Sequence, residues 1–521
     1  ALARTGTKRK RSGRRSRILA GFWWEGNIGR SPQTSQHCCG GNPAAVDTAA
    51  LATPDVAKPN RIDRLSSDVV ELKNQGSGRY LPYQPHPYIF EPPMKIPFSP
   101  PFITDQVFQH VQEVLESGWI TTGPKSRALE QEFTAYTEGQ ASIAVNSWSS
   151  GAILALKWLG IQPGDEVIIP AYTYAATALS VLHAGATPVM CDSGDDFCLD
   201  PKKLSALITE RTKAIIPVDF GGLPADYSAI RAEVEAAADE FQPASRIQEK
   251  FGRIAILTDA AHSLGARWNG LSAAMGGDIT IYSTHAVKNL TTAEGGMIVL
   301  NLPPWFEVEL EEKWFTLHRL NGQTKDAFAK SKAGGWRYDI VTDGMKMNMP
   351  DICAAIGLGQ IATYPSALKR RREIFERYES GLDHAFFRMP VSQLDTRQSS
   401  YHLFAVRLHP EWVAQRDEII DFAAAQDVAV NVHFIPLPEL TLFKELGYSS
   451  SSVPQAVSMS NSEISLPIYP QMTNEMADRV IEVMNQAARA TKKVSRADRP
   501  ARSRKTVPNS IQPSVQSRIS K

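Results

Sequence analysis

Residues 278–301 read DITIYSTHAVKNLTTAEGGMIVLN, two short apolar runs on either side of a segment that holds one lysine, Lys288. Short runs rich in isoleucine and valine, bounded by glycine or polar residues, are typical of β-strands. A surface loop is the commonest place for a lysine, because lysine is rarely buried without a partner. The alternative is an amine that condenses with a carbonyl group. The sequence on either side bears on this choice.

Four similar runs precede this stretch and alternate with helical or loop segments. They are EVIIP (166–170), TPVMCD (187–192), AIIPVDF (214–220) and RIAILTDA (253–260). Continuous apolar strands that alternate with helices indicate an α/β fold, with a mostly parallel central sheet and helices on both faces. In such sheets ligands bind outside the carboxyl ends of the strands, so functional side chains should follow the strands.

The pattern predicts two folded domains. In the large domain, residues 94–365, we expect Thr104 to cap a helix that ends at Gly118, and Ser149 or Ser150 to cap a second helix. Residues 366–488 predict a smaller C-terminal α/β domain, with a helix over RRREIFERYESGL and a strand in YHLFAVRL.

Both ends of the chain are strongly basic, although the net charge of the 521 residues is only +1. Residues 1–93 and 489–521 show no sustained periodicity, which predicts disordered extensions. Met94 is the first methionine, and we expect it to be the natural start. A basic arm that binds nucleic acid or anionic lipid is the less favoured alternative.

Apolar runs and cysteines restrict the protein class. No run approaches the roughly 18–20 residues that span a membrane, and Glu25 interrupts the one candidate for a secretory signal, ILAGFWW. The five cysteines include no CxxC pair and no zinc spacing. We therefore expect a cytoplasmic protein without a metal site.

Polar residues that follow the strands fit the needs of pyridoxal 5′-phosphate. This cofactor requires a lysine that forms an imine, a carboxylate at the pyridine nitrogen, an aromatic ring over one face, and donors for the phosphate. Asp259 ends one strand and could meet the nitrogen, although capping of a helix is its alternative. His262 could bind the ring oxygen, although a lone histidine is more often structural.

Other residues supply the remaining parts of this pattern. Trp148 and Ser149 open a predicted helix in NSWSSGAILAL (146–156), where backbone N–H groups bind phosphate, with ordinary capping as the alternative. Ser283 could reach the same phosphate, and Tyr174 could stack on the ring, with core packing as its alternative. Each signal is modest alone, but all of them favour one ligand at one sheet edge.

Residues 94–487 resemble the DegT/DnrJ/StrS family of sugar-nucleotide aminotransferases, which are pyridoxal-phosphate enzymes of fold type I. The matching stretches follow the family's order and include SGWITTGP (117–124), GDEVIIPAYTYAAT (164–177), TDAAHSLGA (258–266), YSTHAVKN (282–289), MKMNMPDICAAIGLGQ (345–360) and SLPIYPQMT (465–473). The resemblance implies Lys288 as the Schiff-base lysine and Asp259 at the pyridine nitrogen. It also places His262 near the ring hydroxyl, Tyr174 on the ring, and Ser283 with the amides of residues 148 and 149 at the phosphate.

The resemblance implies transfer of an amino group, usually from glutamate, to a keto group of a nucleotide-linked sugar. Such a reaction serves amino-sugar biosynthesis for a cell-surface polysaccharide or a glycosylated metabolite. By family position, Thr122 and His433 line the sugar pocket, although His433 could equally be a packed core histidine. A homodimer with shared active sites is implied, in which Lys346 or Asn348 reaches the neighbouring subunit's cofactor phosphate.

Departures from the family pattern leave alternatives. Trp148 is unexpectedly bulky for its position in the phosphate-binding turn. Family members that dehydrate or deoxygenate sugars carry histidine at the lysine position, so Lys288 argues against that chemistry. An aromatising member that makes an amino-benzoate would keep the lysine and stays open. A non-catalytic regulatory protein is disfavoured because the cofactor residues are retained together. The sugar, its keto position and the amino donor are not identified.

Overall fold

The computed structural model describes residues 94–325, 327–330 and 336–494. The predicted extension 1–93 and residues 495–521 lie outside the described residues. The last helix, α14 (Asn474–Val494), continues past residue 488, where the C-terminal tail is predicted to begin. None of the described helices is long and apolar enough to cross a membrane.

A seven-stranded sheet forms the centre, in the order β1-β9-β8-β5-β4-β2-β3. Its strands are β1 (Ala141–Val145), β2 (Glu166–Pro170), β3 (Thr187–Cys191), β4 (Thr212–Ile215), β5 (Ala255–Asp259), β8 (Ile279–Ser283) and β9 (Gly296–Leu300). Within this sheet only β9 runs antiparallel to its neighbours, so the predicted mostly parallel sheet is confirmed. Strand β1 is not among the runs recognised in the sequence, because ASIAV is short and a serine interrupts it.

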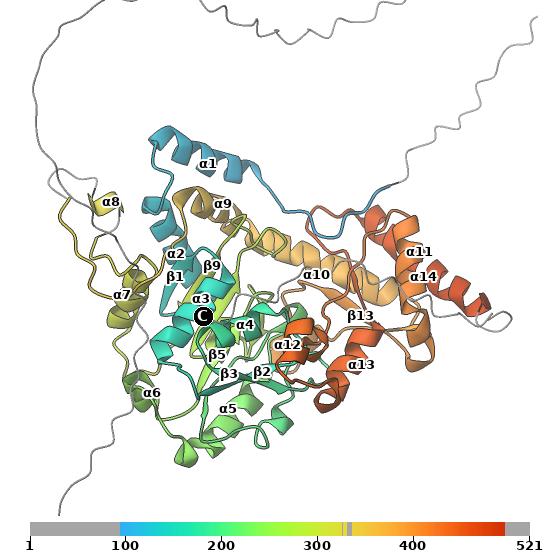
Figure 1. Cartoon of the computed structure of the whole chain (residues 1–521). Coiled ribbons are helices and arrows are strands. Elements are labelled where there is room, and N and C mark those ends of the chain that lie inside the picture. The colour runs from blue at the N-terminus through green and yellow to red at the C-terminus, as the bar shows by residue number, and fades with distance from the viewer. Residues whose placement is uncertain (1–93, 326, 331–335, 495–521) are drawn as a thin grey trace, which may run out of the picture. The chain divides into compact units, whose positions relative to one another are not determined.

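Helices cover both faces of this sheet (Figure 1). Because successive strand residues point to opposite faces, Ile298 and Leu300 of β9 join the core that includes α3 (Trp148–Leu159). Met297 and Val299 instead pack with α2 (Pro124–Thr137) and α9 (Asp351–Ile361). The other helices of this part are α1 (Asp105–Ser117), α4 (Ala176–His183), α5 (Tyr227–Ala236), α6 (Arg246–Phe251), α7 (Val308–His318) and α8 (Ala327–Lys330). The predicted two-faced α/β architecture is confirmed.

The capping hydrogen bonds at the starts of two helices differ from those predicted. Helix α1 begins after Thr104 and ends at Gly118 as predicted, but the Thr104 hydroxyl donates to the carbonyl of Gly359, 3.4 Å away, instead of capping. Helix α3 is capped by Ser147, whose Oγ accepts the N–H of Ser150 at 3.1 Å. The prediction of Ser149 or Ser150 as the cap is therefore wrong, because Ser147 is the last extended residue before the helix.

The C-terminal region has its own three-stranded sheet and apolar core. The sheet contains β10 (Phe387–Arg388), β13 (Phe404–Leu408) and β14 (Glu463–Leu466). Helices α10 (Tyr364–Gly381), α11 (Arg416–Ala425) and α14 pack on it, and α12 (Thr441–Glu445) and α13 (Pro454–Ser462) complete the region (Figure 1). Short strands β6 (Arg267–Trp268), β7 (Leu271–Ser272), β11 (Gln393–Leu394) and β12 (Arg397–Gln398) form a third sheet. The domain boundary at residue 365 stays a prediction.

Ile96 packs in this C-terminal core, against residues that are far from it in the sequence. It is completely buried among side chains from residues 374–488. Its N–H donates to the carbonyl of Asp427 at 2.9 Å, and its carbonyl accepts the N–H of Ala429 at 3.0 Å. The first described residues therefore belong structurally to the region that ends the chain.

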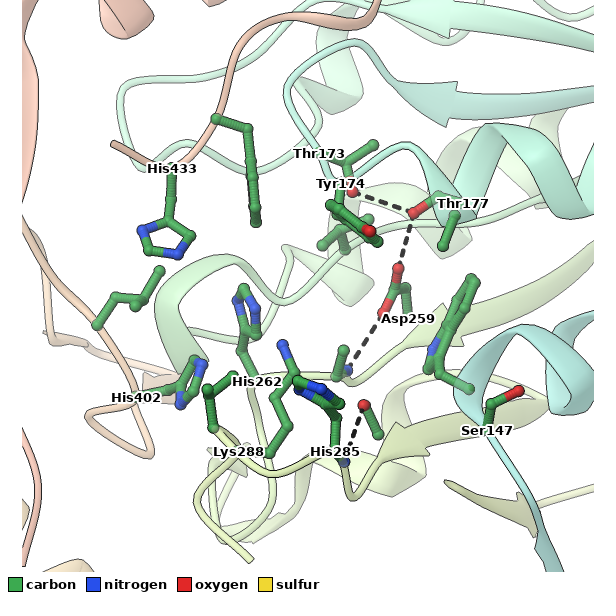
Figure 2. A pocket seen from close by; sticks show the side chains of 18 of the residues that line it. Ser147, Thr173, Tyr174, Thr177, Asp259, His262, His285, Lys288, His402 and His433 are labelled. Atoms are coloured by element: carbon green, nitrogen blue, oxygen red, sulfur yellow. Dashed lines mark hydrogen bonds between the residues drawn. The ribbon is translucent and has the colours of Figure 1, made fainter. Parts of the chain in front are cut away.

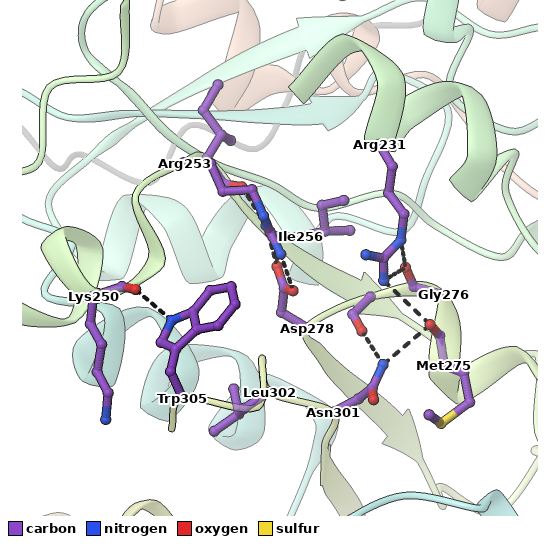
Figure 3. A network of polar contacts seen from close by, with 12 residues as sticks. Arg231, Lys250, Arg253, Ile256, Met275, Gly276, Asp278, Asn301, Leu302 and Trp305 are labelled. Carbon is purple, nitrogen blue, oxygen red and sulfur yellow. Dashed lines mark hydrogen bonds and ion pairs between the residues drawn. The ribbon is translucent and has the colours of Figure 1, made fainter. Parts of the chain in front are cut away.

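An ion pair lies at the amino ends of β5 and β8. Asp278, directly before β8, is only 2% exposed and accepts two hydrogen bonds from the Arg253 guanidinium, at 2.9 and 2.7 Å. It also accepts the backbone N–H of Ile256 at 2.8 Å, and Arg231 and Asn301 satisfy nearby backbone carbonyls (Figure 3). The buried carboxylate at this end thus has a partner of opposite sign.

Candidate active site

A pocket opens at the opposite, carboxyl ends of β2, β5 and β8, and residues of the C-terminal region form one of its walls (Figure 2). Most of the site residues expected from the sequence line it: Trp148, Ser149, Tyr174, Asp259, His262, Ser283, Lys288 and His433. The structure therefore brings together groups that are up to 285 residues apart in the chain (148 to 433).

Asp259, the last residue of β5, is the buried carboxylate of the pocket. Its Oδ2 accepts the hydroxyl of Thr177 at 2.8 Å, and its Oδ1 accepts the N–H of Ala261 at 3.2 Å. Thr173 and Thr177 are also hydrogen-bonded, 3.0 Å apart, so Thr173 acts as donor because Thr177 gives its own proton to Asp259. No helix follows β5 directly, so the helix-cap alternative for Asp259 is wrong.

Burial without a bonded cation sets the electrostatics of Asp259. Desolvation raises its pKa to about 6, against the opposing effects of the Thr177 hydrogen bond, the Ala261 N–H and the nearby Lys288 amine. The carboxyl is thus mostly ionised at neutral pH, but at a cost that a cationic ligand would relieve.

Lys288 lies in the turn between β8 and β9, and its side chain reaches into the pocket (Figure 2). Burial lowers its pKa to about 8, although the negative charge of Asp259 acts in the opposite direction. The residue is half-buried and lines the pocket, so the structure contradicts the alternative of a lysine on a surface loop. An appreciable fraction of this amine is unprotonated near neutral pH and can act as a nucleophile or a base.

His262 and His402 are both buried beside Lys288, with ring centroids 4.4 Å apart. The N–H of Gly221 donates to Nδ1 of His262 at 3.2 Å, so the imidazole proton lies on Nε2. Burial, followed by the charge of Lys288, holds the pKa of His262 well below its usual value. His262 is therefore a neutral ring that can donate from Nε2.

The first turn of α3 packs directly against β9, because β9 has no side chain at Gly296. A Cβ atom there would lie 2.7–2.8 Å from the backbone of Ser147 and Trp148. The first N–H groups of a helix have no partner within the helix and attract anions. Ser147 satisfies the N–H of Ser150, which leaves the amides of Trp148 and Ser149, with the Ser283 hydroxyl lining the same pocket.

Trp148 and Tyr174 differ in where their rings lie: the Trp148 ring is buried, and the Tyr174 ring is exposed. The indole of Trp148 is 6% exposed, and its Nε1 donates to the carbonyl of Ile281 in β8 at 3.0 Å. The bulky side chain thus anchors the helix to the sheet and leaves the backbone N–H free for a ligand. Tyr174 is 66% exposed and lines the pocket, so core packing of its ring is wrong.

His433 supplies the opposite wall, with its ring directed into the pocket (Figure 2). Its Nδ1 is hydrogen-bonded to the Ser465 hydroxyl at 2.9 Å, and its ring stacks on Phe98 with centroids 5.7 Å apart. Burial and the charge of Lys288 lower the pKa of His433 to about 4. The histidine is therefore a neutral pocket residue and not a core histidine.

Three of the expected residues do not line this pocket. The buried hydroxyl of Thr122 donates to the carbonyl of Met349 at 2.5 Å and accepts a hydrogen bond from the Asn348 amide. Lys346 forms a backbone bridge with Leu320. The expected substrate contact of Thr122 is thus not made within one chain, and contacts of Lys346 and Asn348 with a neighbouring subunit stay predictions.

Sequence reasoning missed several groups of the site. Thr177 lies in the first turn of α4, shortly after the end of β2, and a polar residue that follows a predicted strand was a usable signal. His402 and Ser147 also line the pocket, and Ser465 binds His433 from β14. Their positions depend on contacts between distant segments, which no local pattern reveals.

The donor set fits pyridoxal 5′-phosphate. An ionised carboxylate faces the pocket beside an amine of low pKa, as a pyridinium and an aldehyde would require. Free amides at the start of α3 and the hydroxyl of Ser283 suit a phosphate, and the close approach at Gly296 keeps that turn in place. Tyr174 and His262 offer an exposed ring and a neutral donor.

Comparisons with known proteins give the relatives of this chain. The sequence model of the DegT/DnrJ/EryC1/StrS aminotransferase family matches residues 101–485. The chain is 35% identical over 394 residues to the spore coat polysaccharide biosynthesis protein SpsC of Bacillus subtilis, covering 75% of this chain and 96% of that protein.

Solved structures give the same result. A protein of Streptococcus pneumoniae described as a sugar aminotransferase, Spr1654, matches in its PMP form with a TM-score of 0.73 and 42% identity, over 76% of this chain and 99% of that chain. Its PLP form matches with a TM-score of 0.73 and 40% identity, over the same shares of the two chains.

Proposed function

This chain belongs to the DegT/DnrJ/EryC1/StrS aminotransferase family, and we propose that it transfers an amino group from glutamate to a keto sugar carried on a nucleotide. Enzymes of this family depend on pyridoxal 5′-phosphate, and the fold is that of fold type I. The observation that carries the proposal is the position of Lys288 and Asp259 in the lining of one pocket, each with a pKa shifted by burial.

The cofactor, when bound, supplies an electron sink that stabilises negative charge at the carbon next to the reacting nitrogen. Asp259 would hold the pyridine nitrogen in its protonated form, because the buried, ionised carboxylate is stabilised by a positive charge beside it. Thr177 orients that carboxylate. His262 would donate from Nε2 to the ring oxygen, and Tyr174 would cover one face of the ring.

Lys288 would attach the cofactor and move protons in the pocket. Its pKa of about 8 lets the amine accept a proton from a substrate carbon and return it within the working pH range. The amides of Trp148 and Ser149, with the hydroxyl of Ser283, would hold the phosphate and fix the reacting atoms relative to Lys288.

Substrate class and setting are the finer part of the proposal. The similarity to a polysaccharide biosynthesis protein and to a sugar aminotransferase supports a sugar acceptor and a role in amino-sugar biosynthesis. We propose His433 as a substrate contact, since its ring lines the pocket opposite Asp259. A cytoplasmic homodimer, in which Thr122, Lys346 and Asn348 serve the neighbouring pocket, completes the proposal.

The visible absorbance spectrum of the purified full chain tests the amino-donor half of the reaction. We expect a cofactor band that glutamate converts to that of the pyridoxamine form, and that the Lys288→Ala variant lacks. A panel of nucleotide-linked 3-keto and 4-keto sugars would then be tested for restoring the original band. A cofactor band that glutamate leaves unchanged would contradict glutamate as donor, and a protein without a band would contradict the proposal as a whole.

A further inference from the structure

Glu463 is a completely buried acid behind the His433 wall of the pocket. It is the first residue of β14, and strand alternation puts Ser465 on the same face. The segment that carries His433 pairs with β14 through Asn431 and Ser465, with backbone hydrogen bonds of 3.0 and 2.7 Å. This pairing brings His433 opposite Glu463.

A chain of hydrogen bonds joins the acid to the pocket. Oε2 of Glu463 accepts the backbone N–H of His433 at 2.9 Å, and Oε1 is bonded to the hydroxyl of Ser465. The same hydroxyl is bonded to Nδ1 of His433 at 2.9 Å. Among the described residues none bonds to Nε2, so this nitrogen is left to meet a ligand.

The charged groups around Glu463 are engaged elsewhere. Arg416 donates to the carbonyl of Ser460 at 2.7 Å and pairs with Asp417. Arg407 lies opposite Glu463 in β13, but its guanidinium donates to the carbonyl of Asp195 at 3.0 Å.

Tyr172 is a further titratable neighbour, and its hydroxyl donates to the His433 carbonyl at 2.5 Å. Burial therefore raises the pKa of Glu463 to about 8, despite the opposing hydrogen bonds from Ser465 and His433 and the charge of Arg416. The acid is largely protonated at pH 7.

The protonation state of Glu463 dictates the direction of every bond in the chain. A protonated Glu463 donates to Ser465, Ser465 donates to Nδ1, and the imidazole proton must lie on Nε2. An ionised Glu463 accepts from Ser465, Ser465 accepts from Nδ1–H, and Nε2 carries a lone pair. Between these states each proton moves one step along the chain, and one proton leaves at Nε2 on the pocket side.

We propose that Glu463 and Ser465 are positioning residues that set the hydrogen-bond polarity of His433: Nε2 donates to the ligand while Glu463 is protonated, and accepts once it is ionised. At neutral pH His433 therefore offers a proton to an acceptor oxygen of the substrate, such as a hydroxyl, carbonyl or carboxylate oxygen. The inference rests on the proposed function only in treating His433 as a substrate contact.

A switch of tautomer is distinct from ordinary titration of the histidine. Burial keeps the His433 ring neutral well above its pKa of about 4, so its charge does not change between pH 6 and 9. Only the position of its proton changes, and the pH at the midpoint of this change equals the pKa of Glu463.

Nitrogen-15 NMR of the full-length, cofactor-loaded protein labelled at histidine reads this tautomer directly, and the His433→Gln variant assigns the signal. We expect the ratio of Nε2–H to Nδ1–H to fall from about 10:1 at pH 7 to about 1:10 at pH 9. The experiment needs no turnover, so its outcome is independent of whether the proposed sugar or amino donor is right.

Glu463→Gln gives the sharpest variant. The side-chain oxygen must still accept the His433 N–H, so the amide nitrogen faces Ser465 and donates, as the protonated acid does. We expect Nε2–H at every pH from 6 to 9. Ser465→Ala should abolish the pH dependence, whereas Ser462→Ala, which removes a nearby hydroxyl that donates to the helix carbonyls of Ser458 and Met459, should behave as wild type.

Two results would overturn the inference. One is a wild-type tautomer that does not change between pH 6 and 9, and the other is a Glu463→Gln protein with the same transition as wild type. Because the Gln variant conserves shape and donor pattern, it tests the inference even if Ser465→Ala fails to fold.

Discussion

Asp259 and Asp278 are buried aspartates at opposite ends of the same sheet, and their environments are opposite. Asp278, at the amino end, receives a two-pronged ion pair from Arg253 and a backbone N–H (Figure 3). Among the described residues, Asp259, at the carboxyl end, is bonded to the Thr177 hydroxyl and a backbone N–H but to no cation, and burial raises its pKa to about 6.

The difference separates stability from chemistry along one set of strands. A buried charge with a matched partner is already neutralised and has no need of a ligand. Substitution of either group destabilises the protein, because it leaves the other charge buried and unpaired. A buried charge without a bonded cation can bind a cationic ligand. Its burial lowers the stability of the protein until that ligand binds. The amino end of the sheet is thus built for stability and the carboxyl end for binding.

The largest effect should come from removing the amine at the carboxyl end. Lys288→Ala is expected to lower the turnover number by at least about 10²–10⁴-fold, because the pocket loses its nucleophile and its proton carrier. Steady-state kinetics measure this loss. Lys250→Ala, at the amino end, is the matched control and should retain activity, since Lys250 pairs with Glu311 and the Phe306 ring, away from the pocket. Equal losses in the two variants would break the comparison.

Asp259→Asn should lower activity by about 10²–10³-fold while the fold persists. The amide oxygen can accept the Ala261 N–H, and the amide nitrogen can donate to the Thr177 hydroxyl, which then donates to Thr173, so the charge is lost while both contacts persist. Thermal unfolding should show a stability equal to or above that of wild type, because a poorly compensated buried charge has been removed. A variant that unfolds more easily and keeps its activity would mean that Asp259 is structural.

Asp278→Asn should give the reverse pattern. The variant leaves the Arg253 guanidinium without its carboxylate, which should cost about 3–5 kcal/mol of unfolding free energy, measured in urea. Activity per folded molecule should stay near that of wild type. An unchanged urea midpoint would show that the ion pair contributes little.

The smallest effect concerns the charge of Lys288. Amine-selective labelling of the cofactor-free protein, followed by mass spectrometry, should give a half-maximal rate for Lys288 near pH 8. The carboxylate of Asp259 favours the protonated amine, so Asp259→Asn should move the Lys288 midpoint to a lower pH. A midpoint above that of wild type would contradict the sign of this coupling.

Local sequence patterns predicted the strands β2, β5 and β8 and the polar residues that follow them, because chain direction alone fixes the edge at which such residues meet. The amino-acid sequence was therefore enough to group Asp259, Lys288 and Tyr174 at one edge of the sheet. Glu463 could not be assigned in this way, since its significance comes from Ser465 and from a histidine-bearing segment that pairs only in the folded chain.

Thr122 shows a second limit of the sequence. Its family position predicts a substrate contact, yet within one chain its hydroxyl is bonded to Met349 and Asn348. A resemblance transfers positions along the chain, but the partners of a side chain depend on packing and on which copy of the chain supplies them.

The burial of Ile96 in the C-terminal core affects how the chain can mature during synthesis. Its partners Asp427 and Ala429 are made more than 300 residues later, since 427 − 96 = 331. At ribosomal rates of about 5–20 residues per second, this segment waits roughly 20–60 s before its partners exist. The central sheet can form during that interval, whereas the wall that carries His433 and Glu463 is completed only when the last helices are released.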